Sequence, residues 1–324
     1  MDRIPSSEWP SPEERPAIER LNAPALPPPL RARSKRIHPA VNLLFFLATV
    51  YSTLVAGTLF FASELEIDSF VELLITPSLW VHGMSYSFCV LAILGAHEMG
   101  HFVACRIYGV DATWPFFIPG PNPFGTFGAV IRIRSRIPDR RALFDIGVAG
   151  PIAGFVVAVP VLIYALSQST IIPSPSDRSG ILFPDCPLIS ILGRLFLDLS
   201  GDVQIQPHPT YFAAWIGLFA TSLNLLPLGQ LDGGHIVYAL SRRAHFLVTR
   251  LGAPALILIG YLTSGHHLIL FGLIFVFIGR SHPPLLEEQV GLGRGRMLVA
   301  WLALLIFILC FIPSSPSIVA GGSG

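Results

Sequence analysis

Long uncharged apolar segments dominate this sequence and constrain its fold more than any other feature. The first, 41–62, is long enough to cross a hydrocarbon layer of about 30 Å at a rise of about 1.5 Å per residue. Further apolar blocks lie at 78–105, 143–166, 211–228, 246–262, 268–278 and 297–312. Only 13% of the residues are charged and the mean hydropathy is +0.64, which excludes an ordinary soluble domain. We therefore expect an all-α polytopic membrane protein.

The number of membrane spans depends on one region of the chain. The apolar blocks predict six or seven transmembrane helices. Between 246 and 278, Arg250 and the turn at 264–267 are compatible with two short spans or with a hairpin that does not fully cross. Both counts stay open at this point.

The distribution of basic residues predicts the orientation in the membrane. With seven spans and a cytoplasmic N-terminus, 19 of the 21 lysines and arginines lie on the cytoplasmic side, since only Arg178 and Arg194 lie opposite. If the hairpin at 246–278 is not counted as two spans, the arginines that follow it still lie on the cytoplasmic side. The tail lacks a Ser-rich, Arg-rich amphipathic transit region, which favours a bacterial inner membrane over an organelle.

The ends of the chain differ from the apolar centre. Residues 1–38 are polar and rich in proline, which predicts a disordered cytoplasmic tail. The membrane domain is expected over 39–313, and a short flexible C-terminus over 314–324. The net charge of +1 argues against a nucleic-acid partner, because binding phosphate requires clustered basic residues. The oligomeric state is not predicted.

A histidine motif lies inside the second apolar block. Residues 97–101 read HEMGH, and ionisable groups in such a block are costly and therefore mark functional sites. On a helix, His97 and His101 share one face and can bind one metal ion. Glu98 then lies beside the metal rather than on it.

A third metal ligand is predicted in the fourth block, where residues 224–235 read NLLPLGQLDGGH. Pro227 ends the helix and the glycines allow the chain to turn, which places Asp232 on the same side of the membrane as the end of the histidine helix. A metal ion that activates water needs three protein ligands and one open position. Alone, Asp232 would equally suit a turn at a helix end. His82 and His235 are expected to be structural or interfacial.

The segment 114–132 is apolar but broken by proline and glycine. It predicts a re-entrant β-hairpin, whose exposed edge could pair with an extended substrate. The alternative is a loop at the membrane surface without a role in substrate binding. The residues expected to bind substrate are Phe124, Gly125, Thr126, Phe127 and Gly128. Downstream, Gly147, Gly150 and Gly154 have the spacing of helix packing.

Together, HEMGH and NLLPLGQLDGG resemble the signatures of the site-2 protease family of intramembrane zinc metalloproteases, over about 78–235. The resemblance implies one zinc ion per chain, bound by His97, His101 and Asp232, with Glu98 as general base. It further implies hydrolysis of peptide bonds in or near transmembrane segments, with single-span membrane proteins in the lipid bilayer as substrates.

Two alternatives remain beside that resemblance. The family pattern makes Asn224 a polar group that assists the transition state, but Asn224 could equally hydrogen-bond a neighbouring helix. The rival function is a non-proteolytic metal-binding membrane protein or transporter, because His and Asp in spans also mark ion paths. Glu98 favours hydrolysis, since a metal conduit needs no base next to a ligand.

Overall fold

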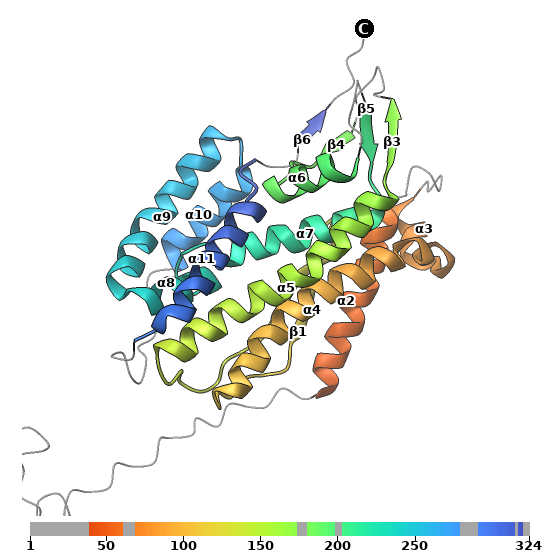
Figure 1. The fold of residues 1–324 in the computed structure, drawn as a ribbon. Helices are drawn as coiled ribbons and strands as arrows, with labels where there is room; N and C mark the ends of the chain where they lie inside the picture. The colour runs from red at the N-terminus through yellow and green to blue at the C-terminus, as the bar shows by residue number, and fades with distance from the viewer. Residues whose placement is uncertain are drawn as a thin grey trace, which may run out of the picture. The chain divides into compact units, whose positions relative to one another are not determined.

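The computed structural model describes residues 39–60, 69–173, 180–197, 203–278, 291–314 and 317–319. Within these residues, a helix covers most of each of the seven predicted apolar blocks (Figure 1). The predicted tail 1–38 lies outside the described residues, as does most of the predicted C-terminus 314–324.

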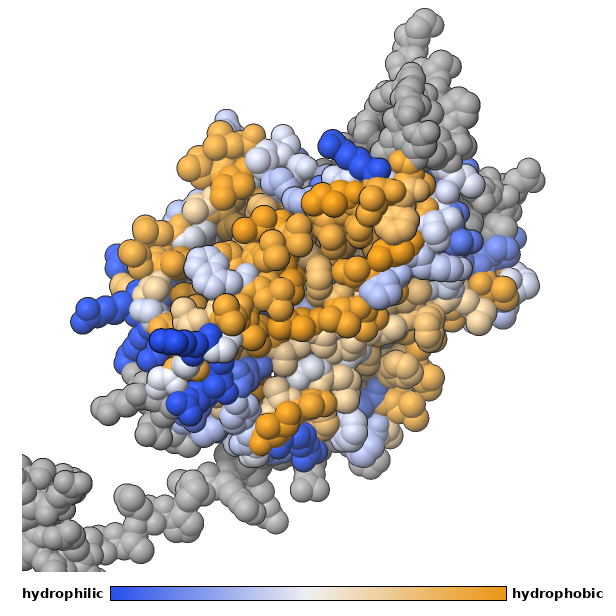
Figure 2. Space-filling model, in the orientation of Figure 1, coloured by the Kyte–Doolittle hydropathy of each residue, from blue (hydrophilic) through white to orange (hydrophobic). Residues whose placement is uncertain are grey.

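Five helices are long and apolar enough to cross a membrane, by length and composition. They are α2 (Pro39–Leu59), η1 with α4 (Pro77–Gly83 and Met84–Ile107), α5 (Arg140–Gln168), α9 (Arg242–Leu262) and α11 (Gly293–Cys310). Large hydrophobic side chains are exposed along α9 and α11 and form a broad apolar area in Figure 2. The chain is a multi-pass integral membrane protein.

Two further predicted spans are shorter. α7 (Pro209–Asn224) has 16 residues and α10 (His266–Ile278) has 13 described residues. These lengths correspond to about 24 and 20 Å, against a hydrocarbon thickness of about 30 Å. α7 ends before Pro227, because proline lacks the backbone N–H and its ring clashes with the preceding turn. After a tight turn, α8 (Asp232–Leu240) follows.

α4 and α5 pack closely along each other, as Figure 1 shows. A Cβ added to Gly100 of α4 would lie 2.4 Å from the carbonyl oxygen of Ala149 in α5. On α5, Gly150 and Gly154 face the two histidine side chains of the HEMGH motif. The predicted packing role of these small residues is confirmed, and it brings α5 against the motif.

The predicted β-hairpin is present between α4 and α5. β1 (Phe116–Pro119) and β2 (Thr126–Val130) pair antiparallel. The Ser52 hydroxyl of α2 donates a hydrogen bond of 2.6 Å to the carbonyl oxygen of Gly125 in the turn. Gly125 has φ +75°, a conformation that only glycine adopts without strain, and its backbone lies against α2. Surrounding helices thus hold this non-helical backbone, which suits membrane depth.

Shorter elements lie between α2 and η1, between α5 and α7, and near the C-terminus. They are α3 (Phe70–Ile75), α6 (Pro187–Phe196), the pair β3 (Thr170–Pro173) with β5 (Val203–Gln206), and the pair β4 (Gly180–Leu182) with β6 (Ser317–Val319). The sequence did not indicate α6, which begins with Pro187 at its first turn and buries Leu188 and Ile189. β6 lies in the segment expected to be flexible.

Candidate metal centre

α4 positions the first motif inside the helix bundle. His97, Glu98 and His101 are all buried, with 5–7% of each residue exposed. Because about 3.6 residues make one helical turn, the two histidines lie on the same face of α4. Their Nε2 atoms are 3.1 Å apart. Both rings therefore point to one place.

The turn after α7 brings the third predicted ligand to that place. Asp232 is the first residue of α8, and its Oδ2 atom lies 3.2 Å from His97 Nε2 and 3.3 Å from His101 Nε2. The turn requires glycine, since a Cβ on Gly233 would lie 2.0 Å from the carbonyl oxygen of Leu225. The second motif thus folds its carboxylate onto the histidines of the first.

The three ligand atoms have the separation that a metal ion requires. Tetrahedral zinc with bonds of about 2.0–2.1 Å holds its ligand atoms about 3.3 Å apart. The separations here are 3.1, 3.2 and 3.3 Å. Within the described part of the chain, no other group of His, Cys, Asp or Glu could hold a metal. Two imidazoles and a carboxylate also leave one position for water, so the residues fit catalytic zinc.

The backbone of α5 fixes the orientation of one ligand. The Nδ1–H group of His101 donates a hydrogen bond of 2.7 Å to the carbonyl oxygen of Ile146. This bond leaves the lone pair on Nε2, the atom that faces the other two ligands. No sequence pattern predicts this contact, because a backbone carbonyl belongs to every residue.

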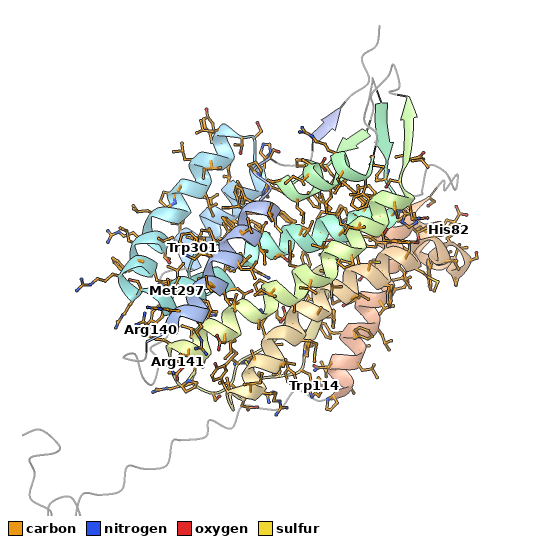
Figure 3. All side chains as sticks on the ribbon, viewed as in Figure 1. His82, Trp114, Arg140, Arg141, Met297 and Trp301 are labelled. Carbon is orange, nitrogen blue, oxygen red and sulfur yellow. The ribbon has the colours of Figure 1, made fainter. Side chains whose placement is uncertain are left out.

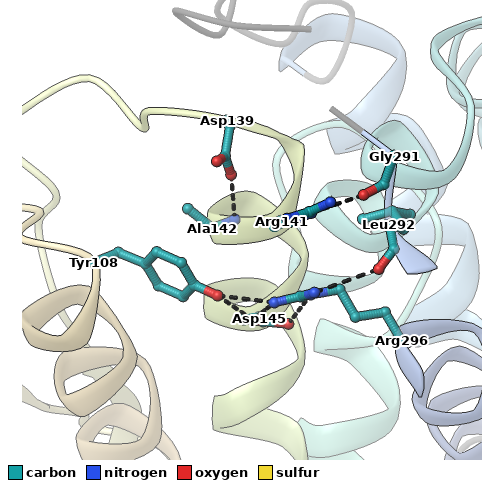
Figure 4. A network of polar contacts seen from close by, with 8 residues as sticks. All are labelled: Tyr108, Asp139, Arg141, Ala142, Asp145, Gly291, Leu292 and Arg296. Carbon is teal, nitrogen blue, oxygen red and sulfur yellow. Dashed lines mark hydrogen bonds and ion pairs between the residues drawn. The ribbon is translucent and has the colours of Figure 1, made fainter. Parts of the chain in front are cut away.

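The residue before Ile146 is anchored to α11 and α4 (Figure 4). Asp145 accepts two hydrogen bonds from Arg296, of 2.9 Å from Nε and 2.7 Å from Nη2, and a third from the Tyr108 hydroxyl. Bidentate pairs of this kind are among the stronger polar contacts in proteins. The network joins three helices beside the carbonyl that holds His101.

Replacing Arg296 by glutamine is expected to lower the melting temperature, because Asp145 loses its bidentate partner. Removing one partner of a partly exposed pair costs about 1–2 kcal/mol, and each kcal/mol corresponds to about 2–4 °C for chains of 150–250 residues. Arg243→Gln, on the exposed surface of α9, is the control. Thermal unfolding in detergent, followed by tryptophan fluorescence, would show equal midpoints for both variants if the network did not matter.

A second prediction concerns Gly150, which lies against the ring of His101. A Cβ at this position would fall 2.1 Å from His101 Nε2, a ligand atom. Alanine favours helix by about 1 kcal/mol over glycine, yet Gly150→Ala should weaken zinc binding by about 10- to 100-fold because the ring must move. Gly193→Ala in α6, where the new Cβ meets nothing within 4 Å, should leave binding intact. Competition with a fluorescent chelator measures both affinities, and equal values would refute the proposed contact.

A cavity of about 270 Å³ opens beside the ligands, and both Glu98 and Asn224 line it. Glu98 follows His97 directly but does not belong to the group that could hold a metal ion. Asn224 is the last residue of α7, and its Nδ2 atom lies 3.2 Å from His97 Nε2. This contact brings the amide to the metal ligands and favours a role there over one in helix packing.

β2 forms one wall of this cavity. Phe127 and Gly128, two of the residues expected to bind substrate, line it. Ala129 and Val130 also line it, although the sequence analysis did not select them. Ala129 and Val130 could have been predicted from the sequence by extending the strand beyond Gly128.

The other three residues expected to bind substrate serve the hairpin itself. The carbonyl oxygen of Phe124 accepts a hydrogen bond of 2.8 Å from the Tyr86 hydroxyl, and Thr126 Oγ1 donates one of 2.8 Å to Ile118. Gly125 lies against α2. Because these residues form the turn and its first pair, none of them lines the cavity. The part of the hairpin that faces the site is therefore 127–130 instead of 124–128.

The two remaining histidines of the motif regions stay outside the metal group, as expected. His82 is exposed in η1, at the far end of the helix that carries the motif (Figure 3). The Cβ of His235 packs close to Gly147 of α5.

Comparisons with known proteins agree with the geometry. The sequence model of peptidase family M50 matches residues 85–263, more than half of the chain. The probable zinc metalloprotease EGY1, chloroplastic, of Arabidopsis thaliana is 33% identical over 232 residues, which cover 69% of this chain and 42% of that protein. Its namesake in Oryza sativa subsp. japonica is 30% identical over 293 residues, 84% of this chain and 50% of that protein.

The chain thus spans about half the length of these relatives or less. Among solved structures, the Site-2 Protease from Methanocaldococcus jannaschii is similar over 78% of this chain and 93% of that chain. The sequence identity in this match is 21% and the TM-score is 0.37.

Proposed function

This chain belongs to peptidase family M50, the site-2 protease family, and we propose that it is an intramembrane zinc metallopeptidase. It would hydrolyse peptide bonds in or near the transmembrane segments of other proteins. The observation that carries the proposal is the meeting of His97, His101 and Asp232 within an apolar helix bundle, beside the buried Glu98. The similar plant proteins are named zinc metalloproteases, which supports zinc, one ion per chain.

Two side chains and one backbone carbonyl of the protein have separate roles in the proposed reaction. A zinc ion held by His97, His101 and Asp232 would lower the pKa of a bound water from about 15.7 to about 7 and would polarise the substrate carbonyl. The Glu98 carboxylate takes the proton of that water and delivers it to the leaving amine nitrogen. Asn224 Nδ2 donates a hydrogen bond to the oxygen of the scissile carbonyl. The carbonyl of Ile146 keeps the ring proton of His101 on Nδ1.

The proposed substrates are single-span membrane proteins. A transmembrane helix hides its carbonyl groups in intrahelical hydrogen bonds, so the substrate must unwind locally before attack. β2 pairs only with β1 among the described strands, which leaves its second edge for an extended segment. Residues 127–130 border the cavity of Glu98, so a strand added there would pass the base.

The domain boundaries and the host membrane stay predictions. We propose a membrane domain over 39–313 with the N-terminus in the cytoplasm. The basic residues at the start of α5, such as Arg140, support this orientation because they lie at the opposite end of the bundle from α6, which carries Arg194 (Figures 1 and 3). A bacterial inner membrane remains our sequence-based proposal, and the chloroplastic plant relatives give it no support.

Reconstitution in sealed vesicles separates peptidase from transporter. The zinc-loaded protein is mixed with a panel of single-span membrane proteins, and fragments are identified by mass spectrometry while zinc flux is followed with a trapped dye. We expect cleavage in or near a transmembrane segment, loss of cleavage after chelation, and no flux. Zinc flux without cleavage of any substrate would contradict the proposed peptidase activity and favour a transporter.

A further inference from the structure

A second cavity borders the turn between α7 and α8, just before Asp232. It is a groove of about 280 Å³ between α8 and α11, which we call the α8–α11 groove, and every residue lining it is apolar or aromatic. On its α11 side, Met297 is 44% and Trp301 is 66% exposed. Since α11 is one of the candidate membrane spans, the groove opens toward lipid. Figure 3 labels both residues, and Figure 2 shows the apolar surface around them.

The groove ends at basic residues. On α11, Met297, Trp301 and Leu304 line it at the spacing of one helix face, and Arg294, three residues before Met297, continues that face. Arg294 is exposed. In Figure 3, Arg140 follows Met297 along the same line toward the start of α5 and α11.

Arg140 is tied directly to the rim of the groove. Its Nε and Nη2 atoms each donate a hydrogen bond of 2.7 Å, to the carbonyl oxygens of Ala239 and Leu240. Leu240 is the last residue of α8 and lines the groove. The apolar groove is therefore bordered by positive charge at the end where α5 and α11 begin.

We propose that the α8–α11 groove binds one acyl chain of an anionic phospholipid, whose phosphate contacts Arg294 and Arg140. An apolar groove with cations at one end matches the two parts of such a lipid. The volume lies just under the range of about 300–1,000 Å³ for small-ligand pockets. An acyl chain is apolar like the lining of the groove, and lipid is always present in the bilayer.

The lipid would also act on the metal centre. Leu225 and Gly233 line the groove, and they directly follow Asn224 and Asp232 in the chain. Asn224 and Leu231, at the two ends of the same turn, line the cavity of the metal ligands. An acyl chain in the groove would contact this turn and limit its movement. Binding of the lipid does not depend on the proposed peptidase activity.

Contact quenching of Trp301 tests the proposal. The full protein is placed in phosphatidylcholine nanodiscs that contain increasing fractions of phosphatidylglycerol or phosphatidylcholine with brominated acyl chains. The Trp301 signal is the difference between wild type and Trp301→Phe, because the chain has five tryptophans. We expect half-quenching at a several-fold lower fraction of the brominated phosphatidylglycerol. Each arginine contact contributes about fivefold to this preference, so Arg294→Gln should reduce it by about that factor.

Two further variants complete the test. Arg132→Gln, an exposed arginine on the hairpin side of α4, should keep the wild-type preference. Ala300→Leu fills the groove and should remove the preference even if Arg294→Gln does not fold. Equal quenching by both brominated lipids in the wild type would overturn the proposal, because Trp301 would then contact ordinary bilayer lipid. A preference that neither Arg294→Gln nor Ala300→Leu changes would overturn it as well.

Discussion

Glu98→Gln is expected to lower kcat/KM for a cleaved single-span substrate by about 10²–10⁴-fold, the contribution of a general base. Glutamine keeps the size of the side chain and fits the same buried position, but it cannot accept a proton. Because Glu98 does not belong to the ligand group, the variant should bind zinc as the wild type does. Loss of activity with retained metal would separate the base from the ligands.

Two measurements make this result specific. Zinc per chain is determined for the same preparations used in the vesicle assay. The matched control is Glu72→Gln, on the exposed surface of α3, which should cleave at the wild-type rate. If Glu98→Gln retained more than about a tenth of the activity with normal zinc, another group would be the base.

Asp232→Asn is expected to cost the protein its zinc. The amide has nearly the shape of the carboxylate but carries no charge, and it is a poor zinc ligand. Changing even a group that only orients a ligand costs about 10–100-fold in metal affinity, so removing a ligand should cost at least about 100-fold. Cleavage should fall with the zinc content.

The control for this variant is Asp111→Asn, an exposed aspartate before the hairpin. Both proteins are dialysed against a buffered zinc concentration and analysed for metal. Full zinc in Asp232→Asn would show that the carboxylate is not a ligand, and the ligand set would then need a different third member.

The sequence was informative where chemistry depends on local spacing. Two histidines four residues apart must share a helix face, and the glycines after Pro227 allow the chain to turn. These rules were sufficient to select Asp232 as the partner of His97 and to place a hairpin after α4. Apolar length alone also located α2, α4, α5, α7, α9, α10 and α11, but not α3, α6 or α8.

Other features depend on contacts between distant segments. Arg296 and Asp145 are 151 residues apart, and no local pattern predicts their pairing. The carbonyl of Ile146 has no sequence signature at all. Within the hairpin, composition pointed to the glycine-rich turn, whereas packing against Ser52 and Tyr86 turns that part away from the cavity. The fourth apolar block extends to 228 and Pro227 was expected to end its helix, but α7 already ends at Asn224.

X-ray absorption at the zinc edge, on purified protein with its zinc content known, identifies the atoms that bind the metal. We expect one zinc per chain, with a shell of only nitrogen and oxygen at about 2.0–2.1 Å and outer scattering from two imidazoles. That result would match His97, His101 and Asp232 as ligands. A sulfur shell at about 2.3 Å, or protein that binds no zinc when zinc is supplied, would contradict it.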